Sequence, residues 1–283
     1  MRSKLFVPAT RPDFFAKALG SDADAISFDL EDAVPADAKT TARMRLAEFL
    51  AGDAIRATGK TIIVRINAVD SGHFQDDLIA LAHARIDLIN LPKGESAKAV
   101  RAAAEAILQC RAQAAPARLL VNIETARGLI RAGDIAVAHP MVAGLQVGLN
   151  DLFAQLGIGR RREHVHAALW TVRVAAGAAG CFAYDGAWPD LTDAAGFRGE
   201  AELARSLGFL GKSCIHPSQI AIANTVFGIG AVTMERARRI VAGARGAAAA
   251  GRGAFALDGE MIDAPMIRQA EAMLAANDPE EDA

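Results

Sequence analysis

The chain has 283 residues and a formal net charge of −2, and 52% of its residues are hydrophobic against 23% charged. This composition supports a sizeable core and excludes a chain that is disordered over most of its length. The near-neutral charge lacks the dense basic stripe typical of nucleic-acid-binding proteins. The short run GRRREH at 159–164 is more typical of a solvated helix start than of an anion site.

The cysteines and the apolar runs indicate the compartment. Cys110, Cys181 and Cys214 are odd in number and widely spaced, which fits neither a disulfide framework nor a zinc site and suits a reducing compartment. The N-terminal stretch MRSKLFVPATRPD has too short an apolar run for a signal peptide, and no segment approaches the ~18 apolar residues of a membrane span. We therefore expect a cytoplasmic protein without nucleic-acid or membrane partners.

Eight short apolar or β-branched runs recur along the chain. They are residues 4–8, 25–29, 61–66, 87–92, 119–123, 144–148, 181–185 and 211–215. The runs lack alternating polar residues, so each is typical of a strand that is buried on both faces. Ala-rich segments with a helical period, such as 97–113 and 162–179, lie between most of them.

This alternation predicts βαβ units around a parallel sheet, and eight strands are the number in a (β/α)8 TIM barrel. A doubly wound sheet is the rival fold. It normally carries a Gly-rich turn after its first strand, where this chain has PATRPD.

The chain continues beyond the eighth run. A helix is expected over 233–250, a connector LDGEMIDAP over 257–265, and a last helix over 266–277 before a frayed acidic tail at 278–283. We predict a barrel over 1–230 and a helical extension over 231–283. Because a barrel closes without this extension, the extension is expected to act as a lid or as an oligomer arm.

Polar residues follow most of the expected strands. In chain order they are Arg11; Asp29, Glu31 and Asp32; Arg65 and Asn67; Lys93; Glu124; Asn150 and Asp151; Asp185; and Lys212 and His216. The carboxyl ends of barrel strands meet at one rim, where the chemistry of such barrels takes place. The list therefore predicts a cluster of carboxylates with a few cations at this rim.

Converging carboxylates repel one another unless a cation offsets them, and an all-oxygen donor set favours Mg²⁺ over zinc. Glu124 and Asp151 end successive strands and are the predicted ligand pair, with Glu31 and Asp32 around the metal-bound waters. The alternative for each carboxylate is a helix cap or a loop ion pair. Arg65 at the buried end of a strand needs an anionic partner, and His216 is more often structural than a base.

Covalent catalysis lacks a signature in this chain. There is no GxSxG elbow and no Cys–His signature, and no lysine is expected inside a strand as a Schiff-base nucleophile would be, although Lys93 and Lys212 lie at strand ends. Metal-stabilised enolate or carbanion chemistry is therefore favoured.

Several motifs occur together over residues 2–275. They are RSKLFVPATRP, ISFDLEDAVP with Lys39 and Arg43 following, VRIN, LPKGES, NIETARG, GLNDLFAQLG, ARSLGFLGKSCIHPSQI and GRGAFALDGEMIDAP. Their order resembles that of the citrate lyase β-subunit-like family, which includes malyl-CoA, citramalyl-CoA and related acyl-CoA lyases. The resemblance implies a (β/α)8 barrel that assembles into homotrimers or hexamers.

By this resemblance, Glu124 and Asp151 match Mg²⁺ ligands that also help to bind the substrate. Arg65 matches an arginine that holds the substrate oxygens. Asp29, Glu31 and Asp32 lie in the acidic turn around the metal waters, where Asp29 orients the turn. Asp263 in MIDAP matches an aspartate that closes over a neighbouring subunit's site and transfers a proton; its alternative role is the N-cap of the last helix.

Two positions depart from the family pattern. Many members have GAED where this chain has GLND at 148–151, so Asn150 replaces an acidic neighbour of Asp151. Ala9 stands where glycine is common. Both changes keep the metal site and weaken any assignment to a particular CoA ester.

The resemblance implies a Mg²⁺-dependent carbon–carbon lyase (EC 4.1.3-type). Its substrate would be a carboxylated 3-hydroxyacyl-CoA of the malyl-, citramalyl- or citryl-CoA type, and its products an acyl-CoA and a keto acid. Three alternatives stay open: a CoA-independent aldolase joining a keto acid to an aldehyde, a citrate lyase complex subunit using an acyl-carrier-protein thioester, and a non-catalytic member that binds keto acid and metal.

Overall fold

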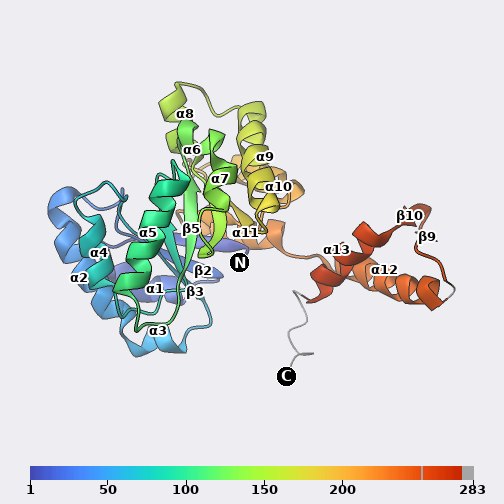
Figure 1. Cartoon of the computed structure of the whole chain (residues 1–283), viewed down its shortest axis with the longest axis horizontal. Helices are drawn as coiled ribbons and strands as arrows, with labels where there is room; N and C mark the ends of the chain where they lie inside the picture. The colour runs from blue at the N-terminus through green and yellow to red at the C-terminus, as the bar shows by residue number, and fades with distance from the viewer. Residues whose placement is uncertain (250, 276–283) are drawn as a thin grey trace. The chain divides into compact units, whose positions relative to one another are not determined.

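The computed structural model describes residues 1–249 and 251–275, which form two compact units, Met1–Phe227 and the residues from Gly228 onward. In the first unit, which Figure 1 colours from blue to orange, eight parallel strands close into a barrel in sequential order, and β1 pairs with both β2 and β8. The strands are β1 Ser3–Pro8, β2 Ala25–Asp29, β3 Thr61–Arg65, β4 Leu88–Leu91, β5 Arg118–Ile123, β6 Val142–Val147, β7 Phe182–Ala187 and β8 Lys212–Cys214. The predicted (β/α)8 barrel is confirmed.

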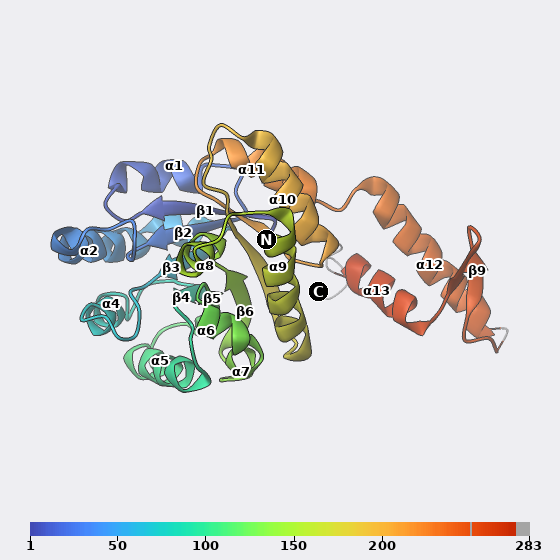
Figure 2. The ribbon, with the colours of Figure 1, turned by 90° about the horizontal axis from the view of Figure 1, so that it is seen from above.

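Helices surround the barrel, as the view in Figure 2 shows for α1, α2, α4, α5, α7 and α9. They are α1 Phe15–Leu19, α2 Lys39–Leu50, α3 Asp53–Ala57, α4 Phe74–Ala80, α5 Ala97–Cys110, α6 Ala126–Ile130, α7 Ala132–Ala136, α8 Leu149–Leu156, α9 Arg162–Ala178, α10 Ala194–Ser206 and α11 Ser218–Phe227, with 3₁₀ turns η1 Pro12–Phe14 and η2 Ala36–Ala38. The main apolar core lies between strands and helices, because each strand is buried on both faces.

The interior of the barrel is more polar than its outer layer. Lys4, Ser27, Asn90, Asn122 and Gln146 lie on the strands and are almost completely buried. Lys4 Nζ donates a hydrogen bond to Gln146 Oε1 and lies 4.5 Å from the centre of the Phe6 ring. Burial lowers the pKa of Lys4 well below its usual range, and the charge of Arg65 lowers it further. These polar side chains form the floor beneath the rim.

The second unit contains α12 Ala231–Ala249, β9 Phe255–Leu257, β10 Glu260–Ile262 and α13 Ala264–Ala275. The expected C-terminal helices are present, but the expected connector contains an antiparallel hairpin. Its turn residues Asp258 and Gly259 have φ angles of 52° and 84°. An Asp–Gly pair favours such a left-handed two-residue turn, so the local sequence explains the hairpin. Position 250 and the expected tail lie outside the described residues.

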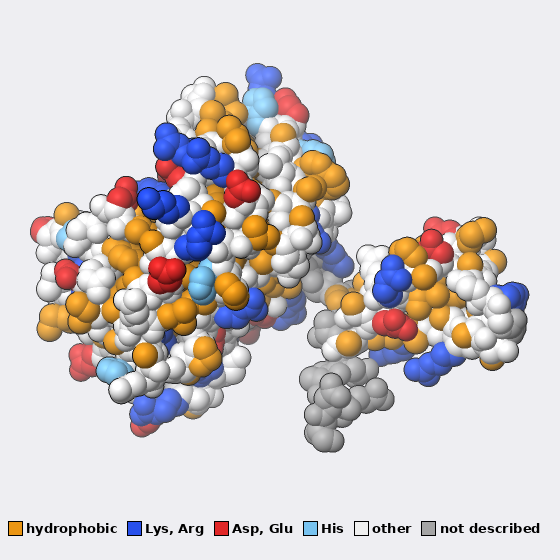
Figure 3. Space-filling model, viewed as in Figure 1, with side chains coloured by type: hydrophobic (Ala, Val, Ile, Leu, Met, Phe, Trp, Pro, Cys, Tyr) orange, Lys and Arg blue, Asp and Glu red, His pale blue; other side chains and the backbone are white. Residues whose placement is uncertain are grey.

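The second unit has a small apolar cluster of its own around Ala237, Ile240, Ile262 and Ala270. Val232 and Met261 remain 84% and 77% exposed. Figure 3 shows hydrophobic side chains between charged ones on the visible face of this unit. Among the helices that the structure describes, none combines the length and hydropathy that a membrane span requires.

Candidate active site

A pocket of about 470 Å³ opens at the carboxyl ends of the barrel strands. Its lining comprises Phe6, Pro8, Asp29, Asp32, Ala33, Arg65, Glu124, Gly148, Leu149, Asn150, Asp151, Ala187 and Ile215. Five of the seven predicted site residues therefore share one pocket. Glu31 lines an adjoining cavity together with Asp32 and Lys93, and Asp263 belongs to the second unit.

The acidic turn after β2 is held by its own first carboxylate. Asp29 accepts hydrogen bonds from the backbone N–H groups of Glu31, at 2.9 Å, and Ala33, at 3.1 Å. From outside the turn, Lys39 Nζ donates to the carbonyl oxygens of Leu30 and Glu31, both at 2.9 Å. These contacts fix the directions in which Glu31 and Asp32 leave the backbone.

Arg65 at the end of β3 faces this turn. Its Nε and Nη2 donate to the two oxygens of Asp29, at 2.8 and 2.6 Å, and its Nη1 lies 2.9 Å from Glu31 Oε2 and 3.3 Å from Asp32 Oδ2. Burial opposes its charge, but the hydrogen bonds and charges of these carboxylates raise the pKa of Arg65. The arginine is therefore a fixed cation that already has three anionic partners.

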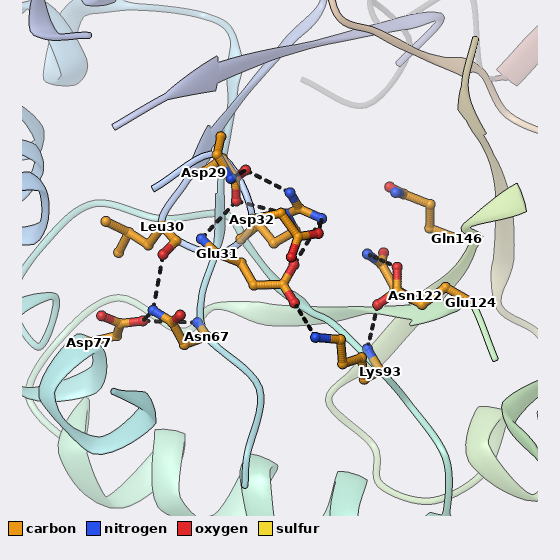
Figure 4. Close-up of polar contacts among 12 residues, drawn as sticks. Asp29, Leu30, Glu31, Asp32, Asn67, Asp77, Lys93, Asn122, Glu124 and Gln146 are labelled. Carbon is orange, nitrogen blue, oxygen red and sulfur yellow. Dashed lines mark hydrogen bonds and ion pairs between the residues drawn. The ribbon is translucent and has the colours of Figure 1, made fainter. Parts of the chain in front are cut away.

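Glu31 is a buried carboxylate whose ionisation is opposed by its surroundings. Burial raises its pKa to about 7, the cation of Arg65 opposes the shift, and Asp32 and Glu124 add to it. Its Oε1 lies 3.2 Å from Lys93 Nζ, and Figure 4 draws this ion pair as a dashed line. Neither oxygen of Glu31 accepts a well-directed hydrogen bond from a described residue. The carboxylate can therefore still accept hydrogen bonds from a nearby ligand, such as a water molecule.

Glu124 follows β5 and is 4% exposed. Its Oε1 accepts a hydrogen bond from the Lys93 backbone N–H at 2.7 Å, and its Oε2 accepts one from Asn122 Nδ2 at 3.3 Å (Figure 4). Thr125, rather than Glu124, caps α6. Burial raises the pKa of Glu124, and the negative charge of Asp151 adds to this effect. Because Thr125 caps α6, the helix-cap alternative does not apply to Glu124.

Gly148 makes room for Glu124. A Cβ at position 148 would lie 2.3 Å from Glu124 Cβ and 2.8 Å from its Oε2, so no larger residue fits there. Asp151 follows in the first turn of α8, and its side chain does not cap the helix. The turn after β6 thus brings a second carboxylate into the pocket that Glu124 lines.

The residues present fit a divalent cation. Glu124 and Asp151 supply only oxygen donors, and the buried Asn122 Oδ1 beside Glu124 has no partner among the described residues. The described residues contain no group of three or more His, Cys, Asp or Glu side chains that could hold an ion without other ligands. Mg²⁺ commonly takes one or two protein carboxylates and completes its shell with water and substrate.

Other strand-end residues have structural roles. Lys212 Nζ is fully buried between Asp185 Oδ2 and Glu200 Oε1, at 2.7 Å from each. His216 Nδ1 contacts the hydroxyl of Ser218 at 2.8 Å and its N–H at 3.2 Å, at the start of α11. Asn67 bonds to Leu30 O and to Asp77.

Asp263 immediately precedes α13, and its Oδ1 accepts a hydrogen bond from Met266 N at 3.4 Å. This is the geometry of the N-cap that the sequence offered as its alternative role. Capping leaves the other oxygen available, so the proton-transfer role of Asp263 stays a prediction.

Sequence reasoning missed Asn122, Gln146 and Gly148 as parts of the site. Asn122 precedes Glu124 by two residues, so the period of a strand places both on the same face. The sequence NIE at 122–124 therefore indicates that Asn122 lies beside Glu124. Nothing comparable in the sequence indicates a role for Gln146, because a single amide inside a strand can serve many purposes.

Known proteins are similar to this chain over most of its length. Residues 2–217 match the model of the HpcH/HpaI aldolase/citrate lyase family. The chain belongs to this family. The resemblance that the motifs indicated is thereby confirmed, and the family is one of enzymes named for aldolases and citrate lyases.

The similar proteins include a citrate lyase subunit beta-like protein of Deinococcus radiodurans (36% identity; 97% of this chain and 96% of that protein). Others, from Cereibacter sphaeroides, are a (3S)-malyl-CoA thioesterase (37%; 97% and 93%) and an L-malyl-CoA/beta-methylmalyl-CoA lyase (33%; 96% and 93%). Among solved structures, CitE of Mycobacterium tuberculosis in complex with magnesium, acetoacetate and coenzyme A has a TM-score of 0.75 at 35% identity and covers 97% of this chain and 98% of its own.

Proposed function

We propose that the protein is a Mg²⁺-dependent carbon–carbon lyase that cleaves a carboxylated 3-hydroxyacyl-CoA into an acyl-CoA and a keto acid. The observation that carries the proposal is one rim pocket that unites the fixed cation of Arg65 with the carboxylates of Glu124 and Asp151. The relative named as a malyl-CoA lyase and the magnesium, acetoacetate and coenzyme A complex of CitE support it.

Glu124 and Asp151 would hold the ion, and the ion would polarise the oxygens of the keto acid. Arg65 would bind the same end of the substrate through an N–H that its carboxylate partners leave available. Asp29 would keep the guanidinium plane of Arg65 fixed while the substrate binds, because Asp29 accepts hydrogen bonds from two of its nitrogens.

In cleavage a base in the pocket would accept the hydroxyl proton as the carbon–carbon bond breaks. The hydroxyl carbon becomes the carbonyl of the keto acid, and the acyl-CoA departs as an enolate that must be protonated at carbon. Asp263 would donate this proton, and in condensation it would remove the α-proton of the acyl-CoA. The second unit would bring Asp263 to the pocket of a neighbouring subunit in a homotrimer or hexamer. This part of the proposal draws on the family resemblance.

The test is a cleavage screen with malyl-, citramalyl-, β-methylmalyl- and citryl-CoA, each with Mg²⁺ and with EDTA. Trapping the keto acid as its phenylhydrazone detects cleavage, and a thiol reagent detects free CoA. Keto acid formed only with Mg²⁺ supports the lyase. Absence of keto acid from every ester overturns it.

A second candidate is hydrolysis of the thioester, which the 37% identity to a malyl-CoA thioesterase favours. Hydrolysis releases free CoA and an intact hydroxy acid, so the same screen separates the two reactions. Activity on free hydroxy acids would instead indicate a CoA-independent aldolase, and activity only on a carrier-protein thioester would indicate a citrate lyase subunit.

A further inference from the structure

A buried network of alternating charges ends at the rim pocket. It begins at Lys212, which is 0% exposed and joins Asp185 and Glu200. Glu200 in turn accepts from Arg160 Nε at 2.9 Å and from Arg160 Nη2 at 2.6 Å. Burial opposes ionisation of Glu200, but Lys212 and Arg160 outweigh it and lower its pKa. The network therefore holds the Arg160 guanidinium in one plane.

The remaining donors of Arg160 reach the pocket wall. Nη2 donates to Ala187 O at 3.0 Å and Nη1 donates to Asn150 Oδ1 at 2.5 Å, and both Ala187 and Asn150 line the pocket. A guanidinium can only donate, so the amide atom that faces Arg160 must be the oxygen. The amide nitrogen of Asn150 is thereby turned away from Arg160, and it has no acceptor among the described residues.

The pocket needs such a donor. Among the described residues of its lining, only Arg65 and Asn150 have side-chain N–H groups. The guanidinium of Arg65 already forms ion pairs with Asp29, Glu31 and Asp32. The ionised carboxylates of the lining can accept hydrogen bonds but cannot donate them. An anionic keto acid would find, besides the one N–H that Arg65 has left, a side-chain donor at Asn150, beside the predicted ligand Asp151.

We propose that Asn150 Nδ2 binds a carboxylate or carbonyl oxygen of the keto-acid portion of the substrate. In this proposal Arg160 is a positioning residue that sets the direction of the amide. The proposal rests on the proposed function, because it assumes that the pocket receives a keto acid.

The test uses direct binding rather than turnover. Pyruvate and oxaloacetate are titrated calorimetrically into the Mg²⁺-loaded full chain, and Asn150→Leu removes the donor at nearly constant size. The dissociation constant of the keto acid should rise about tenfold or more, because a hydrogen bond to a charged group is lost. The Mg²⁺ dissociation constant and Tm should stay as in the wild type.

Arg160→Lys tests the positioning role, with the adjacent exposed Arg161→Lys as its control. A lysine keeps the charge opposite Glu200 but cannot bridge Glu200, Ala187 and Asn150 at once. Arg160→Lys should weaken keto-acid binding several-fold, and Arg161→Lys should not. Asn150→Leu should then weaken keto-acid binding less in the Arg160→Lys background than in the wild type, because both changes disrupt the same interaction.

The outcomes are distinct. If the wild type binds keto acid and Asn150→Leu binds it equally well, the inference is overturned and the proposed function stands. Full additivity of the two changes overturns the positioning role of Arg160. If the wild type binds neither keto acid with Mg²⁺, the proposed function falls and this inference falls with it.

Discussion

At the scale of single residues, Glu124 combines burial with hydrogen-bonded oxygens and a carboxylate neighbour. Its Lys93 and Asn122 partners orient it without neutralising it. A group held in this way is preorganised for a cation, because its charge is available while its rotamer is fixed.

Glu124→Gln should therefore weaken Mg²⁺ binding by about 10–100-fold, because the charge is lost while the shape is kept. Calorimetric titration with Mg²⁺ measures the change. Free energies of unfolding in EDTA should be equal to or above the wild-type value, since a buried charge has been removed. Unchanged Mg²⁺ affinity would exclude Glu124 as a ligand.

Gly148→Ala should displace Glu124 and impair metal binding without altering any polar group. The added Cβ would lie 2.3 Å from Glu124 Cβ. We expect a loss of about 1–3 kcal/mol in the free energy of unfolding together with weaker Mg²⁺ binding. Gly133→Ala is the control, because nothing lies within 4 Å of its added Cβ. Equal behaviour of the two variants would contradict the close approach.

Glu31 should make stability depend on pH. Its folded pKa of about 7 exceeds the ordinary value of 4.5, so the native state binds more protons than the unfolded chain between these pH values. The free energy of unfolding then falls as the pH rises through this window. Glu31→Gln should gain about 1–3 kcal/mol relative to the wild type between pH 4.5 and pH 7.

Urea unfolding in EDTA at several pH values measures this difference. Glu48→Gln is the control, because Glu48 is exposed on α2 and should leave the wild-type profile unchanged. Parallel profiles for wild type and Glu31→Gln would show that Glu31 titrates alike in both states.

At the scale of elements, Lys212 connects β8 to β7 through Asp185 and to α10 through Glu200. Lys212→Met would leave buried carboxylates with fewer partners, which costs about 3–5 kcal/mol. Thermal and urea unfolding should show this loss. Adding Asp185→Asn should recover part of it, because one of the unpaired charges is removed; a further loss would mean that Asp185 is stabilised by other partners.

The elements also show what the sequence can predict. Eight apolar runs predicted the barrel because burial on both faces leaves a local pattern, and the strand-end rule predicted that Arg65, Glu124 and Asp151 share a rim. The link from Arg160 to Asn150 was not predictable, since it depends on how a loop and α10 pack. The hairpin at Asp258–Gly259 was not predicted, although its Asp–Gly turn signal is local, because each of its strands is only three residues long and resembles a connector.

At the scale of the whole molecule, the second unit carries Asp263 but only a small cluster of buried side chains. Asp263→Asn should nearly abolish turnover and leave Mg²⁺ and keto-acid binding intact. Steady-state kinetics and calorimetry on the same preparation measure both. Wild-type turnover would remove Asp263 from the reaction.

Mixing variants tests whether Asp263 acts across subunits. Asp263→Asn and Glu124→Gln subunits, unfolded together and refolded, should regain part of the activity, because some pockets then combine an intact metal site with an intact Asp263. Each variant refolded separately is the control. No recovery in the mixture would indicate that each subunit supplies its own aspartate.

Lys93 has a left-handed backbone, with φ of 52°, which is costly for a residue with a side chain. Its N–H donates a hydrogen bond to Glu124, which lines the rim pocket, and Lys93 itself lines another cavity of about 340 Å³ with Glu95, Arg127 and Arg131. The predicted metal ligand Glu124 thus helps to hold the left-handed backbone of Lys93 in place. Loss of the ion would leave Glu124 less firmly held and weaken this hydrogen bond, so we expect hydrogen exchange at the Lys93 amide to become faster when EDTA is added.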